Sequence, residues 1–434
     1  MRVEAGSTNP AEPYDTAENA FATVKAAAIY ATNLVAQAAA AAEEEGETES
    51  EDQFVEIRVG AGRYAESGIY IGRNVTLRGA TGNRDDVVIG PNSVPSNLAK
   101  DPETVRVLQA TGSRATVADL TITNGYSFSK TASTAVGGGA YLTSGATITN
   151  CHITKCLAYR GGDAAGLYVN GANAYDVLVD KCEKIYKTTA IIEDRGYAVY
   201  VAGNSIVDRC QIVDNTVNNV KPGGSNTFGG ALAVNNSSGS NSKVRNCLIA
   251  RNAVLSGAQA NNSNKYATGV SIRGGYLENC TIVSNRSDVA DVNFVALSVY
   301  NPTTGNAAEF VQNCHIFDNY NSAILRQWAG NAASLDKLQT RITYSCTSPL
   351  SVTSGGKVYN LGTGCVSSED DTKWEFDEKG RFNLLAGSPC ISKGITREWM
   401  TGATDLYGNP RIYGKGPEIG AVEFITHGIT IIVK

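Results

Sequence analysis

The spacing of apolar residues changes once, early in the chain, and the change separates a helix from strands. Within residues 14–42 the apolar positions recur at steps of three and four, which predicts one amphipathic helix capped by Asp15 or Thr16. The apolar stripe consists of Phe21, Val24, Ala28, Ala31 and Val35. An acidic stretch follows, and from Phe54 onward the apolar period is two, in short runs divided by Gly and Asn. We therefore expect a helix that covers one end of a larger β-structure.

A repeat then occupies most of the chain. It is marked by Cys in segments such as ATITNCHI, SKVRNCLI and EFVQNCHI. The aligned cysteines are Cys151, Cys182, Cys210, Cys247, Cys280 and Cys314, with Leu120 one unit earlier and Cys346 one unit later. A second ladder of small residues runs in phase, at Ala140, Gly166, Ala198, Ala231, Gly269, Ala296 and Ala323. Two short strands per unit of about thirty residues predict a parallel β-helix, in which each coil buries its apolar side chains against its neighbours.

The residues around each Cys indicate which side chains face the core. Strand parity predicts one inward column three residues before the Cys, at Ile148, Val179, Val207, Val244, Leu277 and Val311. A second lies two residues after it, at Ile153, Ile212, Ile249, Ile282 and Ile316, and Lys184 interrupts it. Asn precedes the Cys at Asn150, Asn246, Asn279 and Asn313, and a further Asn column is Asn215, Asn252, Asn285 and Asn319. Asn tolerates the left-handed backbone of a sharp bend, and stacked amides can hydrogen-bond along the solenoid.

These ladders resemble those of the pectate-lyase-like superfamily over roughly residues 54–345. The resemblance implies an all-β fold, a right-handed parallel β-helix. The helix predicted from the apolar pattern would form an N-terminal cap within residues 1–53. The segments GSPCISKGI and TDLYGNPRIYGKGPEIGAVEF, in residues 346–434, resemble the choice-of-anchor Q module, with Glu418 and Val422 as departures from the DIGAYE of its members. This second resemblance implies a C-terminal closing module, export and display at a cell surface.

Composition narrows the choice of function. The net charge is −5 with no basic cluster, which argues against nucleic acid as a partner. The ten cysteines form no C-x-x-C pair and only three histidines are present, so we expect no zinc site. Residues 26–42 are too polar for a membrane span, and the first ten residues do not read as a signal peptide. We expect an extracellular or cell-surface protein whose export signal is not part of this chain.

Three sets of residues are candidates for chemistry or binding. Asp180 and Asp208 are predicted on adjacent rungs of one outward column with Arg245 beside them, an arrangement suited to acid–base work or Ca²⁺, or to a plain surface ion-pair ladder. We expect no other cofactor. Tyr168 and Tyr200 are predicted to stack outward, as a platform for sugar rings or as packing beneath a loop. The Cys ladder should be buried and reduced, a Cys365–Cys390 bond is open, and His152 and His315 should both lie at the surface.

These observations favour a non-catalytic extracellular protein, structural or adhesive, whose partners are surface glycans or identical subunits. A polysaccharide lyase or glycoside hydrolase and a pure glycan-binding module are the alternatives. The apolar tail, with Ile429, Ile431 and Val433 in alternation, can fold back on its own module or join a neighbouring subunit in a filament.

Overall fold

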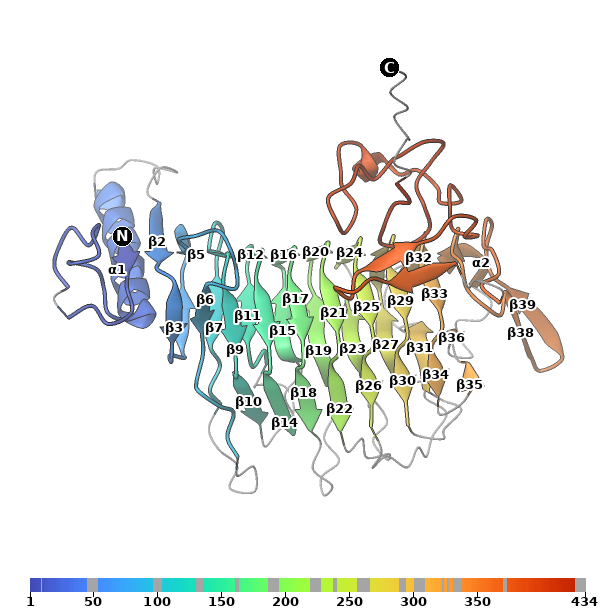
Figure 1. The fold of residues 1–434 in the computed structure, drawn as a ribbon, viewed down its shortest axis with the longest axis horizontal. Coiled ribbons are helices and arrows are strands. Elements are labelled where there is room, and N and C mark those ends of the chain that lie inside the picture. Colours follow the sequence, from blue (N-terminus) through green and yellow to red (C-terminus); the bar gives the residue numbers. More distant parts are fainter. Residues whose placement is uncertain are drawn as a thin grey trace, which may run out of the picture.

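The chain winds into a parallel β-helix (Figure 1). The computed structural model describes residues 1–8, 10–44, 54–96, 104–129, 136–160, 164–185, 195–218, 228–236, 240–255, 266–288, 294–299, 309–321, 324–325, 328–330, 338–369 and 373–425. In these residues four long sheets, here called A to D, run along the solenoid, and successive strands of a sheet pair in parallel except at the end of sheet D. A coil contributes a strand to A, B, D and C in turn, as residues 147–170 do. The predicted fold class is confirmed.

The strands are short, as their period-two apolar runs predict. Sheet A contains β1 (Arg2–Val3), β2 (Val55–Val59), β5 (Val75–Gly79), β8 (Thr116–Ala118), β12 (Thr147–Thr149), β16 (Asn173–Tyr175), β20 (Ile206–Asp208), β24 (Lys243–Arg245), β28 (Gly275–Glu278), β32 (Glu309–Gln312) and β37 (Ile342–Thr343). Sheet B contains β3 (Gly62–Tyr64), β6 (Val87–Ile89), β9 (Thr121–Thr123), β13 (His152–Thr154), β17 (Leu178–Asp180), β21 (Gln211–Val213), β25 (Leu248–Ala250), β29 (Thr281–Val283) and β33 (His315–Phe317).

The other two sheets complete each coil. Sheet C contains β4 (Ile69–Ile71), β7 (Leu108–Thr111), β11 (Ala140–Thr143), β15 (Ala164–Asn170), β19 (Arg195–Ala202), β23 (Phe228–Asn235), β27 (Tyr266–Arg273), β31 (Phe294–Val299) and β36 (Trp328–Gly330). Sheet D contains β10 (Tyr126–Ser129), β14 (Leu157–Arg160), β18 (Glu183–Ile185), β22 (Thr216–Asn218), β26 (Ala253–Val254), β30 (Arg286–Ser287), β34 (Tyr320–Asn321) and β35 (Ile324–Leu325).

Two left-handed bends shape each coil. Asn occupies the first bend in four coils, and in four coils Asn directly follows the left-handed residue of the second. At the bend between sheets A and B, the four Asn residues that precede Cys have φ between 45° and 53°. After sheet B, the side-chain oxygen of Asn252 accepts hydrogen bonds at 3.0 Å from both the backbone and the side-chain nitrogen of Asn215. Asn285 and Asn319 repeat this contact on the following coils. The predicted Asn ladders are therefore confirmed.

The Cys column is buried, but two of its predicted members, Cys182 and Cys346, lie elsewhere. Ser345, whose Oγ accepts from the backbone nitrogen of Cys314 at 3.1 Å, takes the place predicted for Cys346, and Cys346 pairs with His315 instead. Cys210, Cys247, Cys280 and Cys314 stack as predicted, all ten cysteines are thiols, and burial raises the pKa of the three thiols from Cys210 to Cys280. Cys182 instead follows Cys156 in the Asn column, since Glu183 pairs with Leu157 and Thr216.

The coil that holds Cys182 is shifted because each coil has two small core positions, a few residues apart, and Cys fits either. Val177 takes the place predicted for Cys182, and Val179 lies between Ile153 and Ile212, with Ala174 next to Ile148. Lys184 interrupted the predicted inward column for the same reason, because that prediction counted from Cys182. Lys184 belongs to sheet D, in a buried column between Ala158 and Val217.

The N-terminal helix α1 is Val24–Glu44, so it begins ten residues later than predicted. The capping contacts come from elsewhere in the chain: the Glu66 carboxylate accepts from the backbone nitrogens of Val24 and Lys25 at 2.9 and 2.8 Å. Phe21 instead forms a β-bridge with Val3. Val24, Ala28 and Ala31 of the predicted stripe are buried, together with Ala27, where α1 covers the first coil (Figure 1). No helix among the described residues is both long and apolar enough to cross a membrane.

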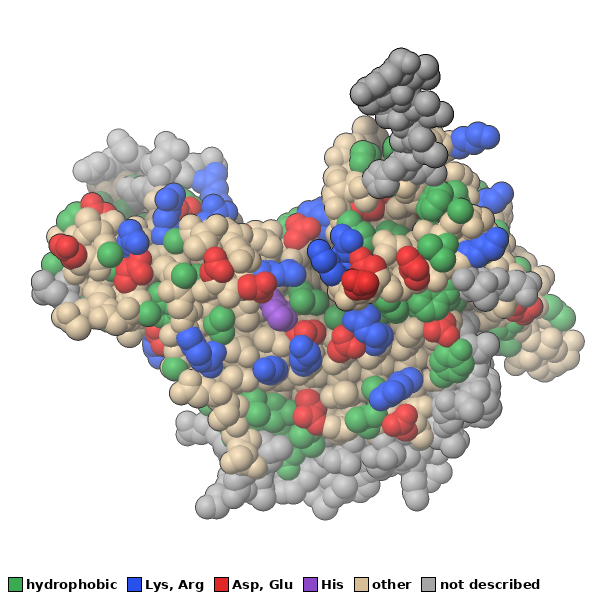
Figure 2. Space-filling view, in the orientation of Figure 1, with side chains coloured by type: hydrophobic (Ala, Val, Ile, Leu, Met, Phe, Trp, Pro, Cys, Tyr) green, Lys and Arg blue, Asp and Glu red, His purple; other side chains and the backbone are tan. Residues whose placement is uncertain are grey.

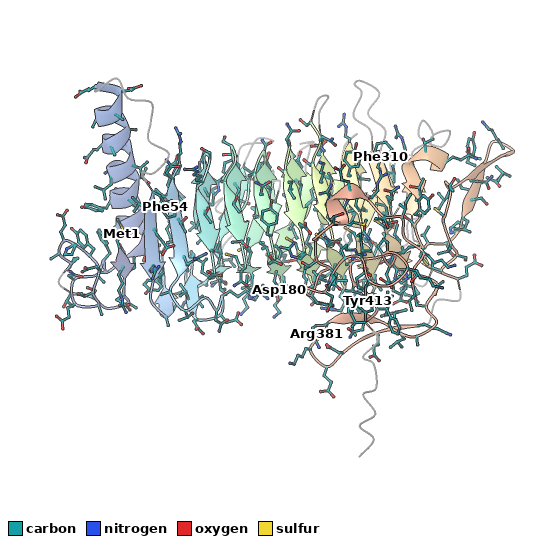
Figure 3. All side chains as sticks on the ribbon, turned by 90° about the horizontal axis from the view of Figure 1, so that it is seen from above. Met1, Phe54, Asp180, Phe310, Arg381 and Tyr413 are labelled. Atoms are coloured by element: carbon teal, nitrogen blue, oxygen red, sulfur yellow. The ribbon has the colours of Figure 1, made fainter. Side chains whose placement is uncertain are left out.

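The C-terminal part closes the far end and also covers one side. Helix α2 (Leu338–Arg341) and the hairpin of β38 (Ser351–Ser354) and β39 (Lys357–Asn360) lie beyond the last coils (Figure 1). Residues 373–425, here called the side module, include β40 (Trp374–Phe376), β41 (Phe382–Leu384) and a 3₁₀ turn at Glu398–Met400. They pack on the outer face of sheet B, over Leu248, Ala250, Val283 and Phe317 (Figure 3). The tail positions Ile429, Ile431 and Val433 lie outside the described residues, so their role in assembly stays a prediction.

Candidate functional site

The structure separates the two carboxylates that the sequence predicts as neighbours. Asp180 ends β17 of sheet B, in register with Val213. Asp208 ends β20 of sheet A, in register with Tyr175 and Arg245. The prediction of one shared column is wrong because it rests on the misplaced Cys182. These two carboxylates therefore do not form an adjacent acid–base or Ca²⁺-binding pair.

Arg245 and Asp208 lie at the edge of the side module. Arg245 Nε donates to Glu278 Oε2 at 2.8 Å, and its guanidinium lies 4.3 Å from the ring centre of Trp399. Burial raises the pKa of Asp208 above its usual value. The hydrogen bond from Asn246 and the nearby arginine charges lower the pKa, but by less than burial raises it. These contacts describe an ion-pair ladder partly covered by the module, which is a structural arrangement.

Asp180 has a different environment, on the outer face of sheet B. His152 Nε2 and Asp180 Oδ1 are 2.8 Å apart, and Lys181 Nζ lies 3.4 Å from Oδ2. Burial raises the pKa of the Asp180 carboxyl, but hydrogen bonds from His152 and Thr154 and the charge of Lys181 outweigh it and hold the pKa below its usual value. Asp180 is therefore an ionised carboxylate whose partners keep it in place.

A groove of about 670 Å³ lies beside this group, over the bend between sheets B and D. Its floor is the hydroxyl row Thr121, Thr123 and Thr154, and Arg63, Lys155, Lys181 and Glu183 stand around it. Both lysines occupy left-handed bend positions, with φ of 55° and 51°, and both are exposed. Figure 2 shows this face, on which Lys and Arg side chains are interspersed with Asp and Glu between the N-terminal end and the side module. The charged side chains that line the groove are therefore three cations and one carboxylate, and Lys181 is also paired with Asp180 beside the groove.

The tyrosine stack is real but only partly accessible. Tyr168 pairs in register with Tyr200, and their rings are 5.0 Å apart and within 3° of parallel. Tyr141, which the sequence reasoning missed, extends the stack at 5.2 Å and carries Arg106 at 4.7 Å. Tyr200 is buried, and Asn235 donates to its hydroxyl at 2.6 Å. The arrangement matches packing beneath other residues better than an open sugar platform.

The two histidines that were predicted to lie at the surface, His152 and His315, have opposite environments. His152 is partly exposed beside the groove. His315 is fully buried, so the prediction of a surface position is wrong for it. Its place in the strand is the outward one, as predicted, but the side module covers that face. Burial by a distant segment is a tertiary effect that strand parity does not report.

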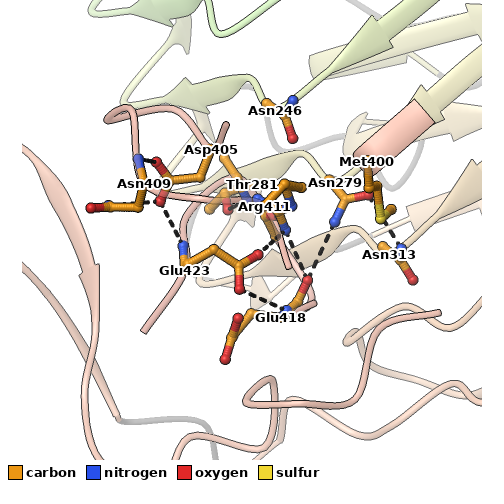
Figure 4. Close-up of polar contacts among 12 residues, drawn as sticks. Asn246, Asn279, Thr281, Asn313, Met400, Asp405, Asn409, Arg411, Glu418 and Glu423 are labelled. Carbon is orange, nitrogen blue, oxygen red and sulfur yellow. Dashed lines mark hydrogen bonds and ion pairs between the residues drawn. The ribbon is translucent and has the colours of Figure 1, made fainter. Parts of the chain in front are cut away.

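The EIGAVEF motif folds around a buried arginine (Figure 4). Arg411 Nη2 donates to the carbonyls of Glu418 and Gly420 at 3.0 and 2.7 Å and lies 3.0 Å from Glu423 Oε1. Asp405 accepts from the backbone of Tyr407, Asn409 and Glu423, each at 2.8 Å. Burial lowers the pKa of Arg411 to about 10. The motif is thus an internal polar network that fixes the side module.

Glu418 makes the stability of this module depend on pH. Burial raises the pKa of its carboxyl to about 7, and no partner for Oε2 is found within the described residues. Because the pKa is higher in the folded state, the protonated form stabilises it. That contribution is complete below the unfolded pKa near 4.5 and is lost as the pH rises through 7.

At pH 8 we expect the free energy of unfolding of Glu418→Gln to exceed that of wild type by roughly 3 kcal/mol. At pH 4.5 the two proteins should be similarly stable. Denaturant unfolding across pH 4.5–8 measures this difference. Glu398→Gln, at an exposed glutamate of the same module, is the matched control and should leave the profile unchanged. A Glu418→Gln profile parallel to that of wild type would contradict the assigned protonation.

Comparison with known proteins finds a likeness among solved structures but none in sequence. The sequence matches no protein-family profile, and no curated protein matches it. Among solved structures it is similar to the crystal structure of the pectate lyase Pel9A, with 14% identity and a TM-score of 0.39 over 98% of this chain and 97% of that one.

Proposed function

We propose that this protein is a non-catalytic, surface-displayed β-helix protein that binds acidic polysaccharide in the groove over sheet B. The observation that carries the proposal is the charge of that groove, where Arg63, Lys155 and Lys181 face Glu183. Threonine hydroxyls at the floor of the groove can hydrogen-bond to sugar hydroxyls, and the cations around it can pair with carboxylate or sulfate groups. The volume is within the range of about 300–1,000 Å³ typical of ligand sites.

The same geometry argues for binding rather than cleavage. The candidate acids Asp180 and Asp208 stand on different sheets, and hydrogen bonds or ion pairs hold each. A lyase or hydrolase needs an acid or base free to exchange a proton with the substrate. The resemblance of the C-terminal segments to the choice-of-anchor Q module supports export and display.

Charge reversal in the groove tests the proposal. We expect Lys155→Glu/Lys181→Glu to weaken binding to polygalacturonate by about tenfold or more, since two exposed ion pairs are lost and replaced by repulsion. The control Lys393→Glu/Lys415→Glu makes the same change in net charge at exposed positions of the side module. Binding is measured by isothermal titration at low and at high salt, with neutral dextran as the negative ligand.

The same samples report on catalysis through the absorbance of unsaturated products. Equal affinity of the groove variant and its control would contradict the proposed site. Product formation that Asp180→Asn or Asp208→Asn abolishes without loss of fold would show that the protein is an enzyme.

A further inference from the structure

Three metal-ligating side chains meet under the side module, from segments far apart in the chain. They are His315, Cys346 and Cys390, and their ligand atoms all lie within 4.8 Å of one another. All three side chains are completely buried. Their spacing in the sequence matches no metal motif, so only the fold brings them together.

Each ligand is held by backbone contacts of a different segment. His315 stands on β33 and forms a parallel bridge with Cys346, whose nitrogen donates to Cys314 at 2.9 Å. The carbonyl of Cys390 accepts from Ile419 at 2.9 Å, inside the EIGAVEF motif. Gly420, at φ 117°, lets this motif approach the solenoid, since a Cβ there would lie 3.2 Å from that of His315.

The imidazole is fixed by aromatic neighbours. The ring of His315 stacks on Phe317 at 3.9 Å, with an angle of 21° between the planes, and meets the edge of Phe382 at 6.1 Å. Cys346, Cys390 and both phenylalanines belong to the apolar cluster that joins the side module to sheet B. The three ligands are therefore oriented before any ion arrives, and their surroundings are mostly apolar.

We propose that His315, Cys346 and Cys390 bind a thiophilic divalent cation such as Zn²⁺. Both thiols lose their protons on binding, and two thiolates with a neutral imidazole give a complex of zero net charge, which an apolar site accommodates. Tetrahedral Zn²⁺ places two thiolate sulfurs roughly 3.8 Å apart, so small side-chain rotations suffice. A water molecule can complete the coordination.

Such an ion would join the last coils to the side module at one point. Two ligands belong to the solenoid and the third to residues 373–425, so binding couples the docking of the module to the metal. This site is separate from the groove over sheet B, and its test does not depend on glycan binding.

The test uses the full chain, purified with reductant and then made metal-free. We expect it to take up one Zn²⁺ per chain by elemental analysis after desalting, with a higher melting temperature than the metal-free form. Co²⁺ should give the thiolate charge-transfer absorption of a tetrahedral site. These measurements on the wild-type protein do not require any variant to fold.

Variants then assign the ligands. Cys390→Ser and His315→Gln should each weaken Co²⁺ binding by at least about tenfold. Cys365→Ser, at a half-buried cysteine outside the cluster, is the matched control and should bind as wild type does. Failure of the wild-type chain to retain Zn²⁺, an unchanged Co²⁺ spectrum in Cys390→Ser, or a Cys346–Cys390 disulfide in the mass spectrum of the reduced preparation would each overturn the proposal.

Discussion

Replacing Ile249 with Asp is expected to unfold the solenoid. Ile249 is fully buried on β25, between Ile212 and Ile282 on the adjacent coils. The change removes a large apolar side chain from a closely packed column, which alone costs about 2–5 kcal/mol. It also buries a carboxylate with no cation beside it, and the sum approaches the whole stability of a typical domain, about 5–15 kcal/mol.

Circular dichroism and urea unfolding measure the loss. The control Ile249→Val keeps the site apolar and should cost only about 1 kcal/mol. An Ile249→Asp protein that unfolds within about 1 kcal/mol of wild type would show that this column does not face the core.

Replacing Arg411 with Met should release the side module. Arg411 is fully buried, and its guanidinium supplies hydrogen bonds to two backbone carbonyls and an ion pair to Glu423. Met fills much of the volume but leaves the Glu423 carboxylate without its cation in the interior. Removing one partner of a buried pair costs about 3–5 kcal/mol.

Limited proteolysis and thermal unfolding of the full chain follow the effect. Cleavage within residues 373–425 should become faster while the β-helix signal in circular dichroism persists. The double variant Arg411→Met/Glu423→Gln removes the stranded charge and should regain part of the lost stability. If the single and double variants were equally stable, the ion pair would not be the source of the effect.

The fold could be predicted because its strongest signals are local. Asn279 has the left-handed φ of the first bend, and Asn252 directly follows the left-handed Arg251 at the second, so both Asn columns mark the bends of their coils correctly. Cys and Val are interchangeable in a small apolar site, so Cys182 itself did not distinguish its column from that of Val177, and the one signal of the shifted register was Lys184 at a predicted core position. That single slip of register also created the false pairing of Asp180 with Asp208.

Other errors come from contacts between distant segments. The start of α1 is set by Glu66, which is remote in sequence from the residues that it caps. The groove depends on Lys155 and Lys181 meeting Arg63 across several coils, a juxtaposition that only the register defines. The cluster of His315 with Cys346 and Cys390 exists because the side module turns back over sheet B.

The outer face of sheet B is divided along its length, with the open groove over the earlier coils and the side module over the later ones. Asp180 marks the boundary, beside the module in Figure 3. Each coil advances the solenoid by roughly 4.8 Å, so the docking position of the module sets a fixed length of open sheet. If the groove binds an extended polymer along the solenoid axis, as proposed, the module would limit the number of polymer units in contact with sheet B to those that this length allows. Inserting one coil between groove and module would lengthen this footprint by one rung without altering either part.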